Sequence, residues 1–311
     1  MATLYLLLLR GSGWLYYLAP GWLRTTLAGA LGGLARLTGY RAAVIRQNLR
    51  YAFPGDEPAQ VQTRDALAKE FFRHFGRLGF EILMLFGPMR RYAEAQGQCT
   101  GIEHWERARA AGRGIILLTS HAGSWEVAAA MGALVEGSDI LLVVRQYRPE
   151  WLRRVIDESR RRCGLDATYE PRTLRDILAR LRRNGIVAIV LDQYAAPPVG
   201  VRVPFFGVPV GTNVAIAVLA KRTGAAVMPL KNYRAENGRI VTELEPPIRW
   251  QSHDDPEVEL AINTAAYSAI IEDHIREHPA QWLWSHRRFK GDLTPLREGE
   301  WERGRQNQVP A

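Results

Sequence analysis

The sequence has 311 residues, a length that fits either one large domain or two average ones. With 47% hydrophobic and 23% charged residues it can bury a sizeable core, which excludes a wholly disordered chain. Its two cysteines, Cys99 and Cys163, form no C-x-x-C pair and accompany no Cys/His cluster of zinc spacing. Neither a disulfide framework nor a structural metal site is therefore predicted.

Positive charge is concentrated at the start of the chain. Residues 1–55 contain six arginines and no Asp, Glu or Lys, so they carry +6 of the net charge of +9. The same segment is rich in Leu, Trp and Tyr, and an apolar, aromatic and cationic composition is typical of anionic membrane surfaces. We therefore expect a membrane-associating N-terminal segment over residues 1–55. Because Pro20 and Arg24 interrupt its most apolar window, a poor spanning helix, a pair of interfacial helices and a packing helix pair of a soluble fold remain open.

A strong helical pattern follows the turn marked by Pro54, Gly55 and Pro58. Apolar residues then recur at spacings of three and four, which predicts one helix with a single apolar stripe that ends at Gly87-Pro88. The stripe consists of Leu67, Phe71, Phe75, Leu78, Ile82 and Leu85.

From about residue 101 the pattern alternates between short apolar runs and helical stretches, which predicts an α/β fold with a mainly parallel mixed sheet flanked by helices. The last strands alternate in polarity and are expected at a sheet edge. We assign one α/β domain to residues 56–291 and a polar C-terminal tail to 292–311. The predicted strands span 113–120, 139–146, 186–193, 225–233 and 239–246, and the predicted helices span 124–134, 149–164, 173–185, 212–224 and 256–278.

The stretch HAGSWE places polar side chains directly after the first predicted strand, where α/β sheets bind their ligands. His121 falls on the strand-to-helix turn, and Glu126 falls near the start of the next helix. We expect a two-member relay in which Glu126 accepts a hydrogen bond from one ring nitrogen and the other ring nitrogen takes a proton from a substrate hydroxyl. The alternative is a histidine at a strand end beside a glutamate that favours a helix N-terminus.

HAGSWE resembles the H-x-x-x-x-[DE] motif of the lysophospholipid and glycerophosphate acyltransferase superfamily. Four further segments are similar to its lipid A late acyltransferase family, the lauroyl and myristoyl acyltransferases of Gram-negative bacteria. They are NLRYAFP at 48–54, VVRQYRPEWLRRVIDESRRRCG at 143–164, the Asp-Gln loop with the Phe-Phe-Gly segment at 191–229, and QWLWSHRRFK at 281–290.

The resemblance implies a glycerophosphate-acyltransferase-like fold, with residues 56–291 as the acyltransferase domain. It implies transfer of a fatty acyl group from acyl carrier protein, or from acyl-CoA, to a hydroxyl of a lipid A precursor at the cytoplasmic face of the cell inner membrane. No cofactor and no metal are expected. By motif position His121 is the general base and Glu126 its orienting partner. Arg145 is a candidate for binding an acceptor phosphate or polarising the thioester carbonyl, and Asp192 and Gln193 are expected beside the same cleft.

Several alternatives stay open at this point. Arg145 can equally pair with a surface carboxylate, and Asp192 can cap a turn. Glu126 in the acidic position is also compatible with phosphatidylinositol mannoside acyltransferases, so another membrane lipid is an alternative acceptor. A non-catalytic lipid-binding protein is a second alternative. Nucleic acid is not an expected partner, because residues 56–311 carry only +3 of the net charge and contain no binding motif. The basic run from Arg153 to Arg162 reads either as a docking face for acidic acyl carrier protein or as a solvated helix face.

Overall fold

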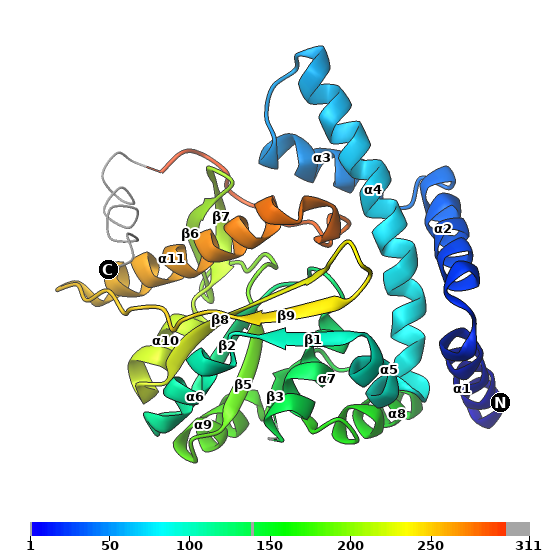
Figure 1. Cartoon of the computed structure of the whole chain (residues 1–311). Coiled ribbons are helices and arrows are strands. Elements are labelled where there is room, and N and C mark those ends of the chain that lie inside the picture. Colours follow the sequence, from blue (N-terminus) through cyan, green and yellow to red (C-terminus); the bar gives the residue numbers. More distant parts are fainter. Residues whose placement is uncertain (1, 138–139, 297–311) are drawn as a thin grey trace.

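A computed structural model describes residues 2–137 and 140–296, and the expected tail beyond residue 296 lies outside the described residues (Figure 1). The helices are α1 (Ala2–Leu18), α2 (Gly21–Leu37), α3 (Ala42–Ala52), α4 (Pro58–Ile82), α5 (Met89–Gln96), α6 (Ile102–Ala110), α7 (Trp125–Glu136), α8 (Glu150–Arg161), α9 (Thr173–Arg182), α10 (Ala215–Thr223) and α11 (Pro256–Glu277), with the 3-10 helices η1 (Leu83–Phe86) and η2 (Pro279–Gln281). The strands are β1 (Gly97–Thr100), β2 (Ile115–Thr119), β3 (Ile140–Val143), β4 (Leu165–Thr168), β5 (Ile186–Val190), β6 (Gly200–Phe205), β7 (Val208–Asn213), β8 (Ala226–Arg234) and β9 (Ile240–Leu244).

The main sheet has seven strands in the order β1-β9-β8-β2-β5-β3-β4. The pairs β1–β9, β2–β8, β2–β5, β3–β5 and β3–β4 are parallel and β8–β9 is antiparallel, so the predicted mainly parallel mixed sheet is confirmed. The expectation that the last strands form the edge is wrong, because β8 lies inside the sheet and β9 is covered by β1. The true edge strand β1 reads GQCT, too short and too polar to stand out as an apolar run.

Both faces of the sheet are buried, each against its own set of helices. Along β2, Ile116 and Leu118 belong to one hydrophobic cluster, and Ile115 and Leu117 belong to the other. All four are at most 1% exposed, and burying such a side chain contributes roughly 1.5–3 kcal/mol. Strand β2 is therefore packed on both faces, which fixes the position of its carboxyl end and of the residues that follow it.

Strands β6 and β7 form a separate antiparallel hairpin that the sequence pattern does not predict. Its turn consists of Phe206 and Gly207, whose φ angles are 53° and 77°, as a two-residue turn with a left-handed backbone requires. The predicted helix over 212–224 begins only at Ala215, because residues 208–213 pair as β7.

Helices α1 and α2 lie outside α4, on its side away from the sheet (Figure 1). Helix α2 approaches α4 so closely that a Cβ on Gly32 would lie 2.1 Å from the carbonyl oxygen of Phe72, and one on Gly76 would lie 2.0 Å from that of Ala28. Such contacts require small residues where two helix backbones meet. Within the described ranges, no helix has the length and apolar content needed to cross a bilayer.

Candidate active site

A histidine and an aspartate meet at the carboxyl edge of the sheet because their strands are neighbours. Strands β2 and β5 are parallel, with Thr119 paired to Val190 at their ends. His121 and Asp192 each follow two residues later, so both side chains emerge at the same edge. The ring Nδ1 of His121 lies 2.9 Å from Oδ1 of Asp192, and the backbone N–H of His121 donates to Oδ2 at 2.9 Å. The structure thus places Asp192 directly against His121.

His121 and Asp192 stabilise each other's charged forms. Asp192 is 3% exposed, and burial alone would raise its pKa. The charge of His121 and the hydrogen bonds from His121 and the indole N–H of Trp282 outweigh burial and lower the pKa of Asp192 to about 2. Burial likewise opposes a charge on His121, but Asp192, with a smaller contribution from Glu126, raises the pKa of His121 above its usual 6.5. Because a carboxylate only accepts, Nδ1 carries a proton and Nε2 of the neutral ring is the basic nitrogen.

The segment from Gln281, the last residue of η2, to Leu283 holds the histidine loop in place. The backbone N–H of Leu283 donates to the carbonyl of His121 at 3.0 Å, and that of Gly123 donates to the carbonyl of Gln281 at 3.0 Å. Between them, the fully buried indole of Trp282 donates to Asp192 at 2.8 Å. The start of QWLWSHRRFK therefore holds the histidine and its carboxylate in one arrangement.

Gly123 and His74 fix the same loop from two other directions. Gly123 has a φ of +57°, and a Cβ there would lie 2.3 Å from Oδ1 of Asn232 and 2.7 Å from its carbonyl oxygen. The left-handed backbone and the lack of space beside Asn232 each exclude a side chain at position 123. Burial lowers the pKa of His74 to about 4, so its ring is neutral at pH 7, and its Nε2–H donates to the carbonyl of Gly123 at 3.1 Å.

The expected hydrogen bond from His121 to Glu126 is replaced by two other pairings. Nδ1 of His121 faces Asp192, while Glu126 accepts from Nη2 and Nε of Arg160 at 2.5 and 3.2 Å. Glu126 lies in the first turn of α7, where its carboxylate reaches α8 instead of the imidazole. Arg160 is 1% exposed, and although burial opposes its charge, Glu126 raises its pKa further above the usual value. The pair joins α7 to α8 beside the site.

Removing this buried arginine should destabilise the protein strongly. Arg160→Met leaves the carboxylate of Glu126, 13% exposed, without its partner, and we expect the free energy of unfolding to fall by about 3–5 kcal/mol. Urea unfolding measures it. Arg154→Met, which breaks an exposed ion pair with Glu150 on the same helix, should change little. The double variant Glu126→Gln/Arg160→Met should recover part of the lost stability, because it no longer contains the unpaired carboxylate. Equal stability of Arg160→Met and Arg154→Met would contradict this expectation.

The other two candidate residues occupy different environments. Arg145 is exposed two residues beyond the end of β3, at the same sheet edge as His121, and makes no hydrogen bond or ion pair with any described residue. Gln193 is partly buried, and its carbonyl accepts a hydrogen bond from Nη1 of Arg288 at 2.8 Å. Arg288 is 1% exposed and also donates to Gly211 and Thr212 of β7. It therefore clamps the loop after Asp192 to the hairpin, although its basic neighbours suggest a surface residue.

The basic run on α8 is mostly neutralised. Arg160 is buried against Glu126, and Arg153, Arg154 and Arg162 pair with acidic residues of the same helix. These ion pairs favour the solvated helix face over the docking face, and Arg161 is left exposed without an ion pair among the residues that the structure describes.

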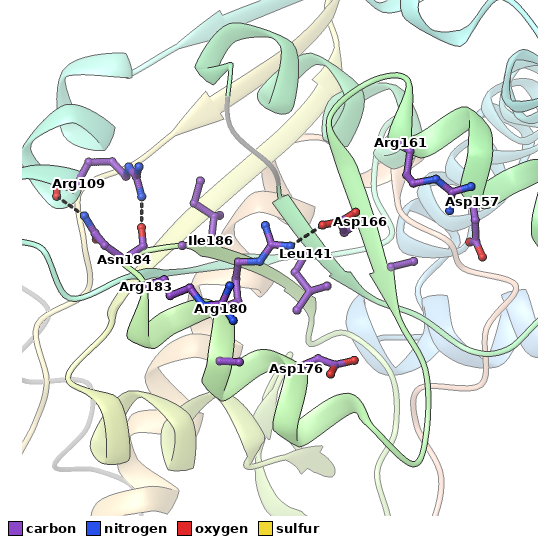
Figure 2. Close-up of a pocket in the computed structure, with 13 residues that line it drawn as sticks. Arg109, Leu141, Asp157, Arg161, Asp166, Asp176, Arg180, Arg183, Asn184 and Ile186 are labelled. Atoms are coloured by element: carbon purple, nitrogen blue, oxygen red, sulfur yellow. Dashed lines mark hydrogen bonds and ion pairs between the residues drawn. The ribbon is translucent and has the colours of Figure 1, made fainter.

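A cavity of about 620 Å³ lies at the opposite edge of the sheet, near the amino ends of β3 and β5 (Figure 2). Its wall is polar, and Figure 2 shows that part of its charge is already paired, as in the contact between Arg180 and Asp166. Because parallel strands place His121 at their carboxyl ends, this cavity is separate from the candidate active site. Its charged lining residues are Arg109, Asp157, Arg161, Asp166, Asp176, Arg180 and Arg183.

Comparison with known proteins gives a consistent result. The family model for bacterial lipid A biosynthesis acyltransferases matches residues 3–291. The chain is 28% identical over 292 residues to the lipid A biosynthesis lauroyltransferase of Escherichia coli, covering 89% of this chain and 88% of that protein. It is 24% identical over 273 residues to a lipid A biosynthesis acyltransferase of Haemophilus influenzae, covering 85% and 81%. It is 27% identical over 264 residues to the phosphatidylinositol mannoside acyltransferase of Mycobacterium tuberculosis, covering 82% and 79%. The chain therefore belongs to the bacterial lipid A biosynthesis acyltransferase family, a family of enzymes.

Proposed function

We propose that this enzyme transfers a fatty acyl group from the thioester of acyl carrier protein to a hydroxyl of a lipid A precursor, with His121 as general base. The observation that carries the proposal is the contact between His121 and Asp192, which leaves Nε2 of the neutral ring as the proton acceptor. Family membership supports the reaction class, and the names of the Escherichia coli and Haemophilus influenzae relatives support the acceptor.

The proposed reaction needs one histidine and no covalent enzyme intermediate. Nε2 of His121 takes the proton of the acceptor hydroxyl while its oxygen attacks the thioester carbonyl carbon. The tetrahedral intermediate then expels the thiolate, the carbon–sulfur bond breaks, and the imidazolium returns its proton to sulfur. Asp192 stabilises the imidazolium and holds the ring orientation between the two steps.

The remaining candidate residues have supporting roles in this proposal. Glu126, bound to Arg160, adds a second negative charge near His121 and keeps α7 and α8 together. Arg145 is exposed at the reacting edge and would bind an acceptor phosphate or polarise the thioester carbonyl. Gln193 would hold the backbone after Asp192 through Arg288.

We further propose that α1 and α2 lie in the membrane interface, at the cytoplasmic face of the inner membrane. Large apolar side chains on both helices are exposed, and residues 1–55 supply arginines without any acid. This combination favours an interfacial position over a spanning one. The exposed apolar residues on the two helices include Leu4, Tyr5, Leu7, Leu8, Leu15, Leu18, Trp22, Leu34 and Leu37.

Charge substitutions on this surface should release the protein from membranes. Leu7→Glu/Trp22→Glu, at positions 61% and 70% exposed, should lower the fraction that cosediments with anionic vesicles by about tenfold or more. Leu174→Glu on α9, at a position 55% exposed, is the matched control and should bind as the wild type does. Equal vesicle binding by the wild type, Leu7→Glu/Trp22→Glu and Leu174→Glu would contradict the proposed position of α1 and α2 in the membrane interface.

Mass spectrometry of a purified reaction tests the proposed function. The full chain is incubated with acyl-loaded carrier protein and a phosphorylated glucosamine-disaccharide lipid, and we expect a product heavier by one acyl group. The Mycobacterium tuberculosis relative makes a phosphatidylinositol mannoside the second acceptor to test. Acylation of that lipid alone would keep the reaction and change the acceptor. Acylation of neither acceptor would contradict the proposal and favour a lipid-binding protein.

A further inference from the structure

The cavity at the amino ends of β3 and β5 collects cations from the ends of three helices (Figure 2). Arg109 lies in the last turn of α6, Arg161 is the last residue of α8, and Arg183 follows α9 as its C-cap residue. All three line the same cavity of about 620 Å³, together with Arg180 of α9. Segments that are distant in the sequence thus bring four arginines to one cavity.

The three aspartates in the same wall are already engaged, each with a cation or a hydroxyl. The contacts are those of Asp157 with Arg153 at 3.3 Å and with Tyr169, of Asp166 with Arg180, and of Asp176 with Thr168 at 2.8 Å and with Arg175 at 3.7 Å. Two of these cations, Arg153 and Arg175, come from outside the cavity wall. The aspartates therefore do not neutralise the remaining arginines of the cavity.

Three arginines of the cavity pair with no carboxylate in the described part of the chain. The side chains of Arg161 and Arg183 are exposed, and neither forms a hydrogen bond or an ion pair with any residue that the structure describes. Arg109 is partly buried and donates to the backbone carbonyl of Asn184, an uncharged acceptor. The carboxyl end of a helix carries only about half a negative charge, which does not cancel a guanidinium. These three positive charges are therefore available to an anion.

The rest of the cavity wall limits the kind of anion that fits. Between the charged residues the wall consists of small or aliphatic side chains, and none of the described lining residues is an aromatic on which a nucleotide base could stack. A volume of about 620 Å³ lies within the range of small-molecule sites. Guanidinium groups bind phosphate oxygens through paired N–H donors. The cavity therefore suits a small phosphate-bearing molecule without an aromatic ring.

We propose that this cavity is a phosphate-binding site in which Arg161 and Arg183 hold the phosphate and Arg109 supplies a third positive charge. Ile186 begins β5 and the candidate active site follows the end of that strand, so roughly 15 Å of strand separates the two sites. A phosphate bound in the cavity therefore does not touch His121, and the inference is independent of the proposed acyl transfer. The phosphate is either the inorganic ion or a group of an organic molecule, and the experiment separates the two sources.

Titration calorimetry of the purified full chain tests the inference, with inorganic phosphate and glucose 6-phosphate as probes in a phosphate-free buffer. At least one probe should bind saturably to the wild type and raise its unfolding temperature as the probe concentration increases. Tighter binding of glucose 6-phosphate would identify an organic phosphate as the ligand, and equal or tighter binding of inorganic phosphate would identify the ion. Glucose, which lacks the phosphate, should not bind.

Two double variants and a matched control locate the bound phosphate. Arg161→Gln/Arg183→Gln should weaken binding about tenfold or more, because it removes two charged donors. Arg161→Lys/Arg183→Lys keeps both charges but loses the paired donors, and it should bind with intermediate strength. Both side chains are exposed, so both variants should unfold close to the wild-type temperature without ligand. Arg182→Gln is the control, because Arg182 is exposed on α9 but does not line the cavity, and it should bind as the wild type does.

Three results would contradict the inference. One is the absence of saturable binding of both phosphates to the wild type. Another is unchanged binding in Arg161→Gln/Arg183→Gln, which would place the phosphate elsewhere on the protein. The third is equal weakening by that double variant and by Arg182→Gln, which would indicate attraction to the net positive charge of the chain. None of these measurements requires acyl transfer, so they leave the proposed function to its own test.

Discussion

Replacing His121 by alanine should lower the turnover of acyl transfer by about three to four orders of magnitude, because it removes the group that accepts the hydroxyl proton. The ring is 18% exposed, so its Nε2 side reaches substrate while Nδ1 is bound to Asp192. Product formation by the purified variant, followed by mass spectrometry, measures the effect. Binding of the acceptor should be largely retained, since the imidazole acts mainly in the transition state.

His121→Ala also leaves the buried carboxylate of Asp192 without one partner, so a fold defect has to be separated from a catalytic one. His121→Asn retains an amide that can donate to Asp192 and serves as the second variant. We expect it to unfold at a temperature close to that of wild type and to be as inactive as His121→Ala. A folded His121→Asn enzyme with more than about a tenth of wild-type turnover would contradict the role of His121 as base.

Asp192→Asn should lower turnover by about 10³- to 10⁴-fold, the range that histidine–carboxylate pairs in other enzymes show. Its side-chain oxygen can still accept from Trp282 and from the backbone of His121. Its amide nitrogen cannot accept from Nδ1–H, so the ring loses both its fixed tautomer and the charge that stabilises the imidazolium. Single-turnover rates with saturating donor measure the effect on the chemical step.

Asp176→Asn provides the control for this substitution. Asp176 accepts from Thr168 and lines the cavity at the opposite edge of the sheet, so the same chemical change there should alter turnover less than about twofold. A similar loss in both variants would indicate a general effect on the fold. Wild-type turnover in Asp192→Asn would refute the relay.

The parts of the fold that follow from periodicity are those with long or fully apolar patterns. The helical stripe from Leu67 to Leu85 corresponds to α4 and η1, and the apolar runs give β2 and β5 within three residues of their ends. Strands β1 and β4 are four residues long and contain polar side chains, while β6 and β7 contain Gly and Pro. Short or proline-containing strands lack a distinctive period, and tertiary pairing decides their conformation.

The candidate active site, like the fold, could be predicted from the sequence only in part. The HAGSWE motif singles out His121, and the end of the predicted strand 186–193 brings Asp192 to the same sheet edge, where the structure places it in contact with His121. Their contact depends on β2 lying next to β5, a pairing of segments 71 residues apart that periodicity does not contain. Glu126 is near His121 in sequence, but the partner of its carboxylate, Arg160, is hidden in a run of arginines that looks exposed. Burial against a distant carboxylate is a tertiary property and leaves no local signal.

The pH dependence of kcat/KM, compared between wild type and Asp192→Asn, tests the central claim most directly. Asp192 raises the pKa of His121 above 6.5, and the base must be neutral, so wild-type activity should fall as pH drops through a value above 6.5. Asp192 itself, with a pKa of about 2, stays ionised throughout that range. Asp192→Asn should move this acid limb to lower pH as well as lowering the rate. An acid limb at the same pH in both enzymes would contradict the assignment of His121, held by Asp192, as the general base.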